Sequence, residues 1–406
     1  MRAFRVTLAG TLVSSLGAGL TMPYLFIYLH DVLGAPLAVA GVVVAVGSAL
    51  GLVASGVGGL IGDHIGLGRL AGFGLLVQGA GTGLLAAASS PGLAAVGVAL
   101  NLVGNSAVWP ALNGLVAEQV PPERRSRAYA LRFGLLNAGI GVGGLLSGWL
   151  VSIERPASFH LVYGIDASTT AAFALLVLIG LRRAPGFLPG ERHREAGTRG
   201  GYREVLRDRA FVGYLLVALA LGVFGYAQLN GPWASFVTSV GGGTTQVVGF
   251  AFAANTAAIV LVQLTVERVT RRVRRSRLLA ATALVWALGW VLTGLAALPG
   301  LHGVAAGIGF VLALTVFGVG ETFYSPVGGG VPNALAPVHL RARYNALASA
   351  TWPLGGFLGP PLAGALLGGG LPMSWVVVIV VGLLGSAAGA VLLGRRLPAH
   401  VERPTA

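Results

Sequence analysis

Residues 92–117 read GLAAVGVALNLVGNSAVWPALNGLVA, and no side chain in this stretch is charged. A helix that crosses the hydrocarbon core of a bilayer needs about 20 predominantly apolar residues, so this stretch is long enough to span one. The rest of the chain follows the same pattern. Only 10% of its 406 residues are charged, against about 25% in an average soluble domain. The chain lacks the polar surface that a water-soluble globule of this size requires, and we expect most of it to lie in lipid.

Twelve stretches share this length and apolar character, so the sequence predicts an all-α membrane protein with twelve transmembrane helices. Backbone groups in hydrocarbon must be hydrogen-bonded within the protein, which favours helices for stretches of this length. Strands of an outer-membrane barrel would alternate in polarity and run for only about 10 residues. The expected spans are 5–29, 38–62, 69–89, 92–117, 128–151, 159–181, 210–239, 245–266, 278–298, 303–331, 343–367 and 373–394.

An internal repeat divides these helices into two sets of six. Prolines, arginines and glycines recur 216 positions apart, at the fourth and fifth expected spans and again at the tenth and eleventh. The matching pairs are Pro110 and Pro326, Pro121 and Pro337, Arg125 and Arg341, Arg127 and Arg343, Gly139 and Gly355, Gly143 and Gly359, and Gly148 and Gly364.

The repeat predicts two pseudo-symmetric six-helix bundles, at residues 1–181 and 210–406, joined by a charged cytoplasmic linker at residues 182–209. Two related halves are the architecture of secondary transporters, which bind substrate near the membrane midplane and alternate in access to the two sides. Small residues let helices approach closely in lipid. We therefore expect tight helix packing at the glycine faces formed by Gly139 and Gly143 and by Gly355 and Gly359. The same faces could also be the surfaces along which the two halves slide.

The basic residues indicate membrane topology rather than a nucleic-acid partner. The formal net charge is +14, and the basic side chains other than histidine are all arginine. They cluster in segments that all lie on one side of the twelve expected spans; Arg155 alone lies on the other. The positive-inside rule then places both termini in the cytoplasm of a cell whose inner or plasma membrane holds the chain.

A loop between the second and third expected spans resembles a known signature. Residues 59–69 read GLIGDHIGLGR, which is similar to the Gly-x-Leu-x-Asp-x-x-Gly loop of the major facilitator superfamily. The resemblance covers the spans, the repeat, the linker and this loop, and it implies a transporter. Asp63 follows a helix whose C-terminal end is already negative, so it needs a positive partner such as Arg69. We therefore expect Asp63, Arg69, Gly59 and Gly66 to act in gating.

Two carboxyl groups fall inside expected spans, Glu321 in the tenth and Asp166 in the sixth. An ionisable group in the membrane costs about 2.5–3.5 kcal/mol on insertion scales and is a functional candidate by default. A carboxyl group in a poorly solvated environment can exchange a proton near neutral pH. The segment from Gly320 and Glu321 to Pro326 also resembles the drug:proton antiporter branch of the superfamily. We expect Glu321, and with it Asp166, to couple transport to protons; packing is the alternative for both.

Polar and aromatic side chains inside the expected spans are candidates for the substrate-binding site. Aromatic rings can hold flat lipophilic cations by cation–π contact. Each of these residues could instead pack helices together or anchor the chain at the membrane surface. The candidates are Tyr24, Asn101, Asn105, Trp109, Asn113, Asn137, Gln228, Asn230, Trp233, Asn255, Gln263, Tyr324 and Trp352.

The sequence offers no signature of an enzyme, a cofactor or a metal site. The chain has no lysine, so it has no phosphate-binding Gly-x-x-x-x-Gly-Lys loop. It has no cysteine, and its seven histidines are scattered without the spacing of metal ligands. The energy for transport would then come from a gradient of ions or of the solute itself.

These observations predict a proton-coupled exporter of lipophilic small molecules, monomeric and working by alternating access. A permease for sugars or other nutrients is the first alternative, and it would depend on hydroxyl and amide contacts rather than on acids within the membrane. A membrane receptor or scaffold that transports nothing is the second, and it would show no proton-dependent conformational change.

Overall fold

The computed structural model of the chain describes residues 2–188, 201–270 and 273–403. These residues form helices and the loops that join them, and no strand occurs among them. In this described part, ten helical segments are long and apolar enough to cross a membrane. The other two expected spans fall on the long helices α4 (Leu67–Ala86) and α15 (Arg341–Gly368). The predicted all-α membrane fold is confirmed.

Contacts between residues divide the chain into two compact units. The first comprises Met1–Arg192 together with Thr244–Ala253, and the second comprises His193–Gly243 together with Ala254–Ala406. The predicted boundaries at 181/182 and 209/210 stay a prediction, and residues 189–200 of the expected linker lie outside the described residues.

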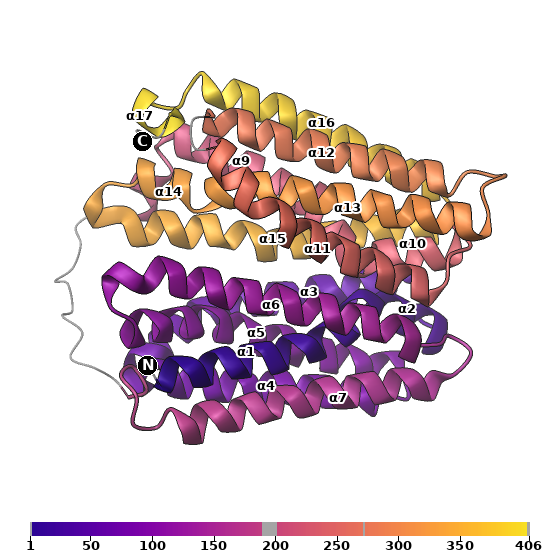
Figure 1. Ribbon diagram of the computed structural model, residues 1–406, viewed down its shortest axis with the longest axis horizontal. Helices are drawn as coiled ribbons and strands as arrows, with labels where there is room; N and C mark the ends of the chain where they lie inside the picture. The colour runs from indigo at the N-terminus through magenta and orange to yellow at the C-terminus, as the bar shows by residue number, and fades with distance from the viewer. Residues whose placement is uncertain (1, 189–200, 271–272, 404–406) are drawn as a thin grey trace. The chain divides into compact units, whose positions relative to one another are not determined.

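In the first unit, α4 packs against α5 and α7, α1 packs against α6 and α7, and α3 packs against α5. The long helices of this unit, coloured indigo to magenta, run side by side (Figure 1). Its elements are α1 (Arg2–Thr21), η1 (Met22–Tyr24), α2 (Leu25–Ile27), η2 (Tyr28–Val32), α3 (Leu37–Ile65), α4, α5 (Pro91–Gln119), α6 (Pro122–Leu150), α7 (Pro156–Leu175) and η3 (Leu176–Gly180).

Local chemistry accounts for several of these boundaries. Pro23 cannot donate a backbone hydrogen bond, and the first span changes there from α1 to the tighter turn η1. The Ser90 hydroxyl accepts from the backbone N–H of Leu93 at the start of α5, where Pro91 is the first helical residue. Gly66 separates α3 from α4 with a φ of 92°, a conformation that glycine adopts without strain.

In the second unit, α12 packs against α13 and α16, and α9 packs against α15 and α16. Its elements, orange to yellow for the later helices in Figure 1, are α8 (Tyr202–Val205), α9 (Arg209–Leu221), η4 (Gly222–Tyr226), η5 (Leu229–Trp233), α10 (Ala234–Ser239), most of α11 (Thr245–Thr270), α12 (Arg275–Ala296), α13 (Gly303–Gly328), α14 (Gly330–Leu335), η6 (Val338–Leu340), α15, α16 (Pro372–Gly394) and α17 (Ala399–Glu402).

The glycine faces pack inside their own units. A Cβ atom added at Gly143 would lie 2.2 Å from the carbonyl oxygen of Leu16, so Gly143 brings α6 against α1. A Cβ atom added at Gly359 would lie 2.6 Å from the Cβ of Ala227, within the second unit. These glycines allow close packing of neighbouring helices within each unit, and sliding between the halves stays a prediction.

Candidate functional site

Glu321 lies in α13, and its carboxylate is held by a side chain from α11. The Asn255 side-chain nitrogen donates to Oε2 of Glu321 at 3.1 Å and also to the carbonyl oxygen of Leu314 at 3.2 Å. Asn255 is buried and Glu321 is partly buried. The structure thus brings together two residues that the sequence analysis placed in different roles.

Three aromatic rings gather beside this acid. The ring of Trp352, in α15, makes T-shaped contacts with the rings of Tyr226 and Tyr324, with centroid distances of 4.8 and 5.7 Å and interplanar angles of 84° and 87°. Tyr324 follows Glu321 by three residues on the same face of α13, and Tyr226 contacts the same Trp352 ring. We call Glu321, Asn255, Tyr226, Tyr324 and Trp352 the acid–aromatic cluster.

Tyr226 was missed by the sequence analysis, although the signal was present. It is an aromatic residue inside an expected span, two positions before Gln228, which was selected. Trp352 is 39% exposed, so the cluster is not sealed within the helix packing. It combines a carboxyl group, an amide and open aromatic surface.

Asp166, the second intramembrane acid, lies between α7 and α1. The Thr21 hydroxyl donates to Oδ2 at 2.8 Å, and the Thr170 hydroxyl donates to Oδ1 at 3.5 Å. Asp166 is only 5% exposed, so its carboxyl group is enclosed by the first unit. Its neighbour Tyr163 is also buried, and the Tyr163 hydroxyl has no hydrogen-bond partner among the described residues. This acid is more enclosed than Glu321.

Arg132 is a cation buried in the first unit, although it was expected to lie with the cytoplasmic arginines. It lies in α6 and is 5% exposed. Nη1 donates to the side-chain oxygen of Asn113, and the guanidinium carbon lies 4.8 Å from the centroid of the Trp109 ring. The isolated position of Arg132 within LRFGLLN, five residues beyond Arg127, was the available signal.

Several predicted substrate contacts form hydrogen bonds that hold helices together. The Gln228 side chain, fully buried, donates to the carbonyl oxygens of Val223 and Gly359 and accepts from Nε1 of Trp375. The Asn137 side chain donates to the carbonyl oxygen of Phe133 one turn earlier in α6, a bond within a single helix. Other bonds between helices join Trp233 to Thr293, Asn101 to Thr82, and Tyr24 to the carbonyl oxygen of Thr245 in the first unit. These bonds favour packing roles for those residues.

Asn105 is exposed on α5, and the repeat offset of 216 makes it the counterpart of Glu321 in the first half. Of the predicted gating residues, Arg69 is exposed on α4. Gly66 lies where an added Cβ would meet the carbonyl oxygen of Phe187 at 2.4 Å. The side chains of Asp63 and Asn230, and the surroundings of Gly59, lie outside the described residues.

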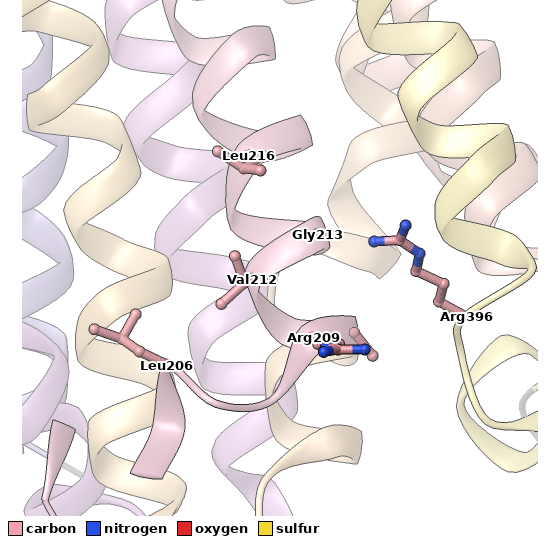
Figure 2. Close-up of a pocket in the computed structure, with 7 residues that line it drawn as sticks. Leu206, Arg209, Val212, Gly213, Leu216 and Arg396 are labelled. Carbon is pink, nitrogen blue, oxygen red and sulfur yellow. The ribbon is translucent and has the colours of Figure 1, made fainter. Parts of the chain in front are cut away.

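A cavity of about 610 Å³ lies at the beginning of α9 (Figure 2). Its apolar lining comes from Leu206, Val212, Gly213 and Leu216, while Arg209 and Arg396 supply two guanidinium groups. Figure 2 shows the Arg396 side chain reaching from beyond the end of α16 toward α9. None of the members of the acid–aromatic cluster lines this cavity, so it is a separate feature of the second unit.

Within the described residues, no group of three histidine, aspartate or glutamate side chains is placed to hold a metal ion. The charged side chains described above that could act in transport are an acid with aromatic neighbours, an enclosed acid and a buried arginine. Charged groups of this kind inside a bundle of membrane-spanning helices are typical of solute transporters.

Comparison with known proteins places the chain in a family. The family model of the Major Facilitator Superfamily matches residues 7–243 and 229–406. The chain belongs to this superfamily of transporters, and it is a multi-pass membrane protein.

Curated relatives are distant. The chain is 26% identical over 411 aligned residues to the uncharacterized MFS-type transporter YttB of Bacillus subtilis, covering 99% of this chain and 97% of YttB. It is 31% identical to the multidrug resistance protein MdtH of Yersinia enterocolitica, over 52% of this chain and 50% of MdtH. The alignment with YqjV of Bacillus subtilis, at 25% identity, covers 63% of YqjV. The chain thus spans less than two thirds of YqjV and about half of MdtH in these matches.

Solved structures share the fold at low sequence identity. A peptide transporter POT in complex with sulfate superposes with a TM-score of 0.76 at 15% identity, covering 99% of this chain and 96% of that one. A mutant of the nucleoside transporter NupG gives a TM-score of 0.71 at 12% identity, covering 98% of this chain and 100% of NupG.

Proposed function

We propose that this transporter exports lipophilic small molecules in exchange for protons, by alternating access. It would act as a monomer in the inner or plasma membrane, with both termini in the cytoplasm. Glu321 takes up a proton when it is open to the outside and releases it when it is open to the cytoplasm, and substrate binding favours the release. Asp166 is proposed as a second proton site, and Asp63 with Arg69 as gating residues.

The observation that carries this proposal is the setting of Glu321. Its carboxylate accepts a hydrogen bond from Asn255, and it lies in a helix whose neighbouring aromatic rings remain partly exposed. A carboxyl group in a membrane span has a free-energy cost, which makes it a candidate for a functional group. Aromatic surface beside it suits flat lipophilic molecules, which bind through ring contacts and apolar burial.

The similarity to proteins named MdtH supports drugs as the substrate class. The energy available from protons is sufficient. One charge moving through 100 mV is worth about 2.3 kcal/mol, which is roughly a fiftyfold concentration ratio at about 1.4 kcal/mol per decade.

Growth of expressing cells on a panel of dyes and antibiotics, with and without an uncoupler, tests this function. We expect raised resistance to several lipophilic compounds, and we expect the uncoupler to remove it. Unchanged resistance across the panel, together with uptake of a sugar or nutrient that depends on expression, would replace export with the permease function.

A further inference from the structure

Arg132 is a cation whose charge is not matched by any acid in the described part of the chain. It has no carboxylate within ion-pair distance there, and its Nε is buried without a hydrogen-bond partner. Its interactions are the bond from Nη1 to Asn113 and the contact with the Trp109 ring. Arg132 lies within a segment long and apolar enough to cross a membrane, and an arginine at the centre of such a helix costs about 2.5–3.5 kcal/mol on insertion scales.

The two contacts leave Nε and Nη2 of the guanidinium without a hydrogen bond among the described residues. A cation–π contact contributes about 0.5–2 kcal/mol, and the Asn113 bond uses one nitrogen of three. The Nε and Nη2 groups form the edge of a guanidinium that can donate two parallel hydrogen bonds to a carboxylate. The Trp109 ring, which the guanidinium overlies, is 44% exposed and offers an aromatic surface. A cation edge beside an open aromatic ring suits an aromatic molecule that carries an acidic group.

We propose that Arg132 is a substrate-binding residue that recognises the carboxylate, or a comparable oxyanion, of an amphipathic substrate whose aromatic part packs on Trp109. The proposal rests on the export function above and adds lipophilic organic acids to its substrates. Asn113 orients the guanidinium by holding Nη1, which leaves the opposite edge for the ligand.

The test uses two fluorescent probes that differ only in charge, an aromatic carboxylic acid and its methyl ester. Their equilibrium affinities are measured on purified protein without any gradient, for the wild type, Arg132→Gln and Arg132→Lys. Arg127→Gln is the matched control, because Arg127 is exposed on the same helix. We expect Arg132→Gln to weaken acid binding about tenfold and to leave ester binding within about twofold. The lysine variant should fall between, since lysine keeps the charge without the bidentate edge.

Equal losses for acid and ester, or no loss for either, would overturn the proposal and leave Arg132 a packing residue. If the Arg132→Gln protein does not fold, the Arg132→Lys variant tests the proposal. A loss of affinity for the acid alone supports the proposal, and an equal loss of affinity for the acid and the ester refutes it. Binding without a gradient is independent of coupling. Intact acid binding without proton-driven export therefore refutes the proposed function alone, whereas export of neutral drugs without selective acid binding refutes this proposal alone.

The cavity at the beginning of α9 carries a second, independent inference. Arg209 is the first residue of α9, and Arg396 follows the end of α16 by two positions, so both lie at the end of membrane-spanning helices. Both are exposed and have no ion pair among the described residues. The nearby Asp208 carboxylate is engaged, because it accepts from the backbone N–H groups of Ala210 and Phe211 and from the hydroxyl of Tyr344.

We infer that this cavity binds the phosphate group of an anionic phospholipid of the cytoplasmic leaflet. The two guanidinium groups match the charge of the headgroup, and the side chains of Leu206, Val212 and Leu216 contact the first part of its acyl chains. Basic pockets between helices on the cytoplasmic side are typical sites for such lipids.

Native mass spectrometry of protein taken from vesicles of phosphatidylglycerol or phosphatidylcholine tests this inference. We expect the wild type to retain phosphatidylglycerol preferentially, and the double variant Arg209→Gln/Arg396→Gln to lose most of that preference. Arg395→Gln is the control, since Arg395 is exposed beside Arg396 but does not line the cavity. An equal loss in Arg395→Gln, equal retention of both lipids, or displacement of the lipid by millimolar inorganic phosphate would contradict the inference.

Discussion

Asn255 donates one side-chain hydrogen bond to the Glu321 carboxylate, at 3.1 Å, and another to the carbonyl oxygen of Leu314. The side-chain amide of Asn255 therefore joins α11 to α13 at two points, the Glu321 carboxylate and the backbone. If Glu321 exchanges protons, Asn255 fixes the position in which it does so.

Replacing Asn255 by alanine should lower proton-driven transport about tenfold, because a hydrogen bond to a charged group is worth about 1.5–3 kcal/mol. Transport into inverted vesicles under a fixed pH gradient measures this loss. Thr256→Val is the matched control, since Thr256 is the buried neighbour of Asn255 on α11. Equal activity in the alanine variant and the wild type would separate Asn255 from coupling.

Trp352→Ala should weaken binding of flat cationic dyes by about two- to thirtyfold, the range of a cation–π contact of about 0.5–2 kcal/mol. Trp352→Phe should retain most of the affinity. Dye binding to purified protein checks this, with Trp149→Ala as the control for loss of an exposed tryptophan, at 67% exposure. A comparable loss in the Trp149 variant would show that the effect is not specific to the acid–aromatic cluster.

Asp166 can be separated from Glu321 by two substitutions. Asp166→Asn keeps an oxygen that accepts from Thr21, so we expect normal thermal stability and a smaller loss of proton coupling than in Glu321→Gln. Asp166→Leu leaves the hydroxyls of Thr21 and Thr170 without this acceptor and should cost about 1–3 kcal/mol of stability. Complete loss of coupling in a stable Asp166→Asn protein would instead make Asp166 the main proton site.

Gly143→Ala should destabilise the packing of α6 on α1, because its Cβ would lie 2.2 Å from the Leu16 carbonyl oxygen. We expect a loss of about 1–3 kcal/mol, measured as a lower melting temperature in detergent. Gly134→Ala on the same helix is the control, since no atom lies within 4 Å of its added Cβ. Equal melting temperatures for both variants would contradict the packing described for Gly143.

The sequence predicted the helical spans because length and lack of charge are local properties, and it located Glu321 because an acid in an apolar stretch is conspicuous. It could not predict that Asn255 and Glu321 meet, since they are 66 residues apart and only the helix packing joins them. It did not single out Arg132, because a one-dimensional pattern cannot separate the last arginine of a cytoplasmic cluster from a side chain buried between helices.

Proton flux in liposomes that contain the purified protein tests the central claim most directly. Adding a transported drug should drive a pH change in the lumen with the wild type and with Glu118→Gln, whose acid is exposed at the end of α5. With Glu321→Gln, the flux should fall to the level of empty liposomes while drug binding persists. A drug-driven proton flux in the Glu321→Gln protein equal to that of the wild type would contradict the account.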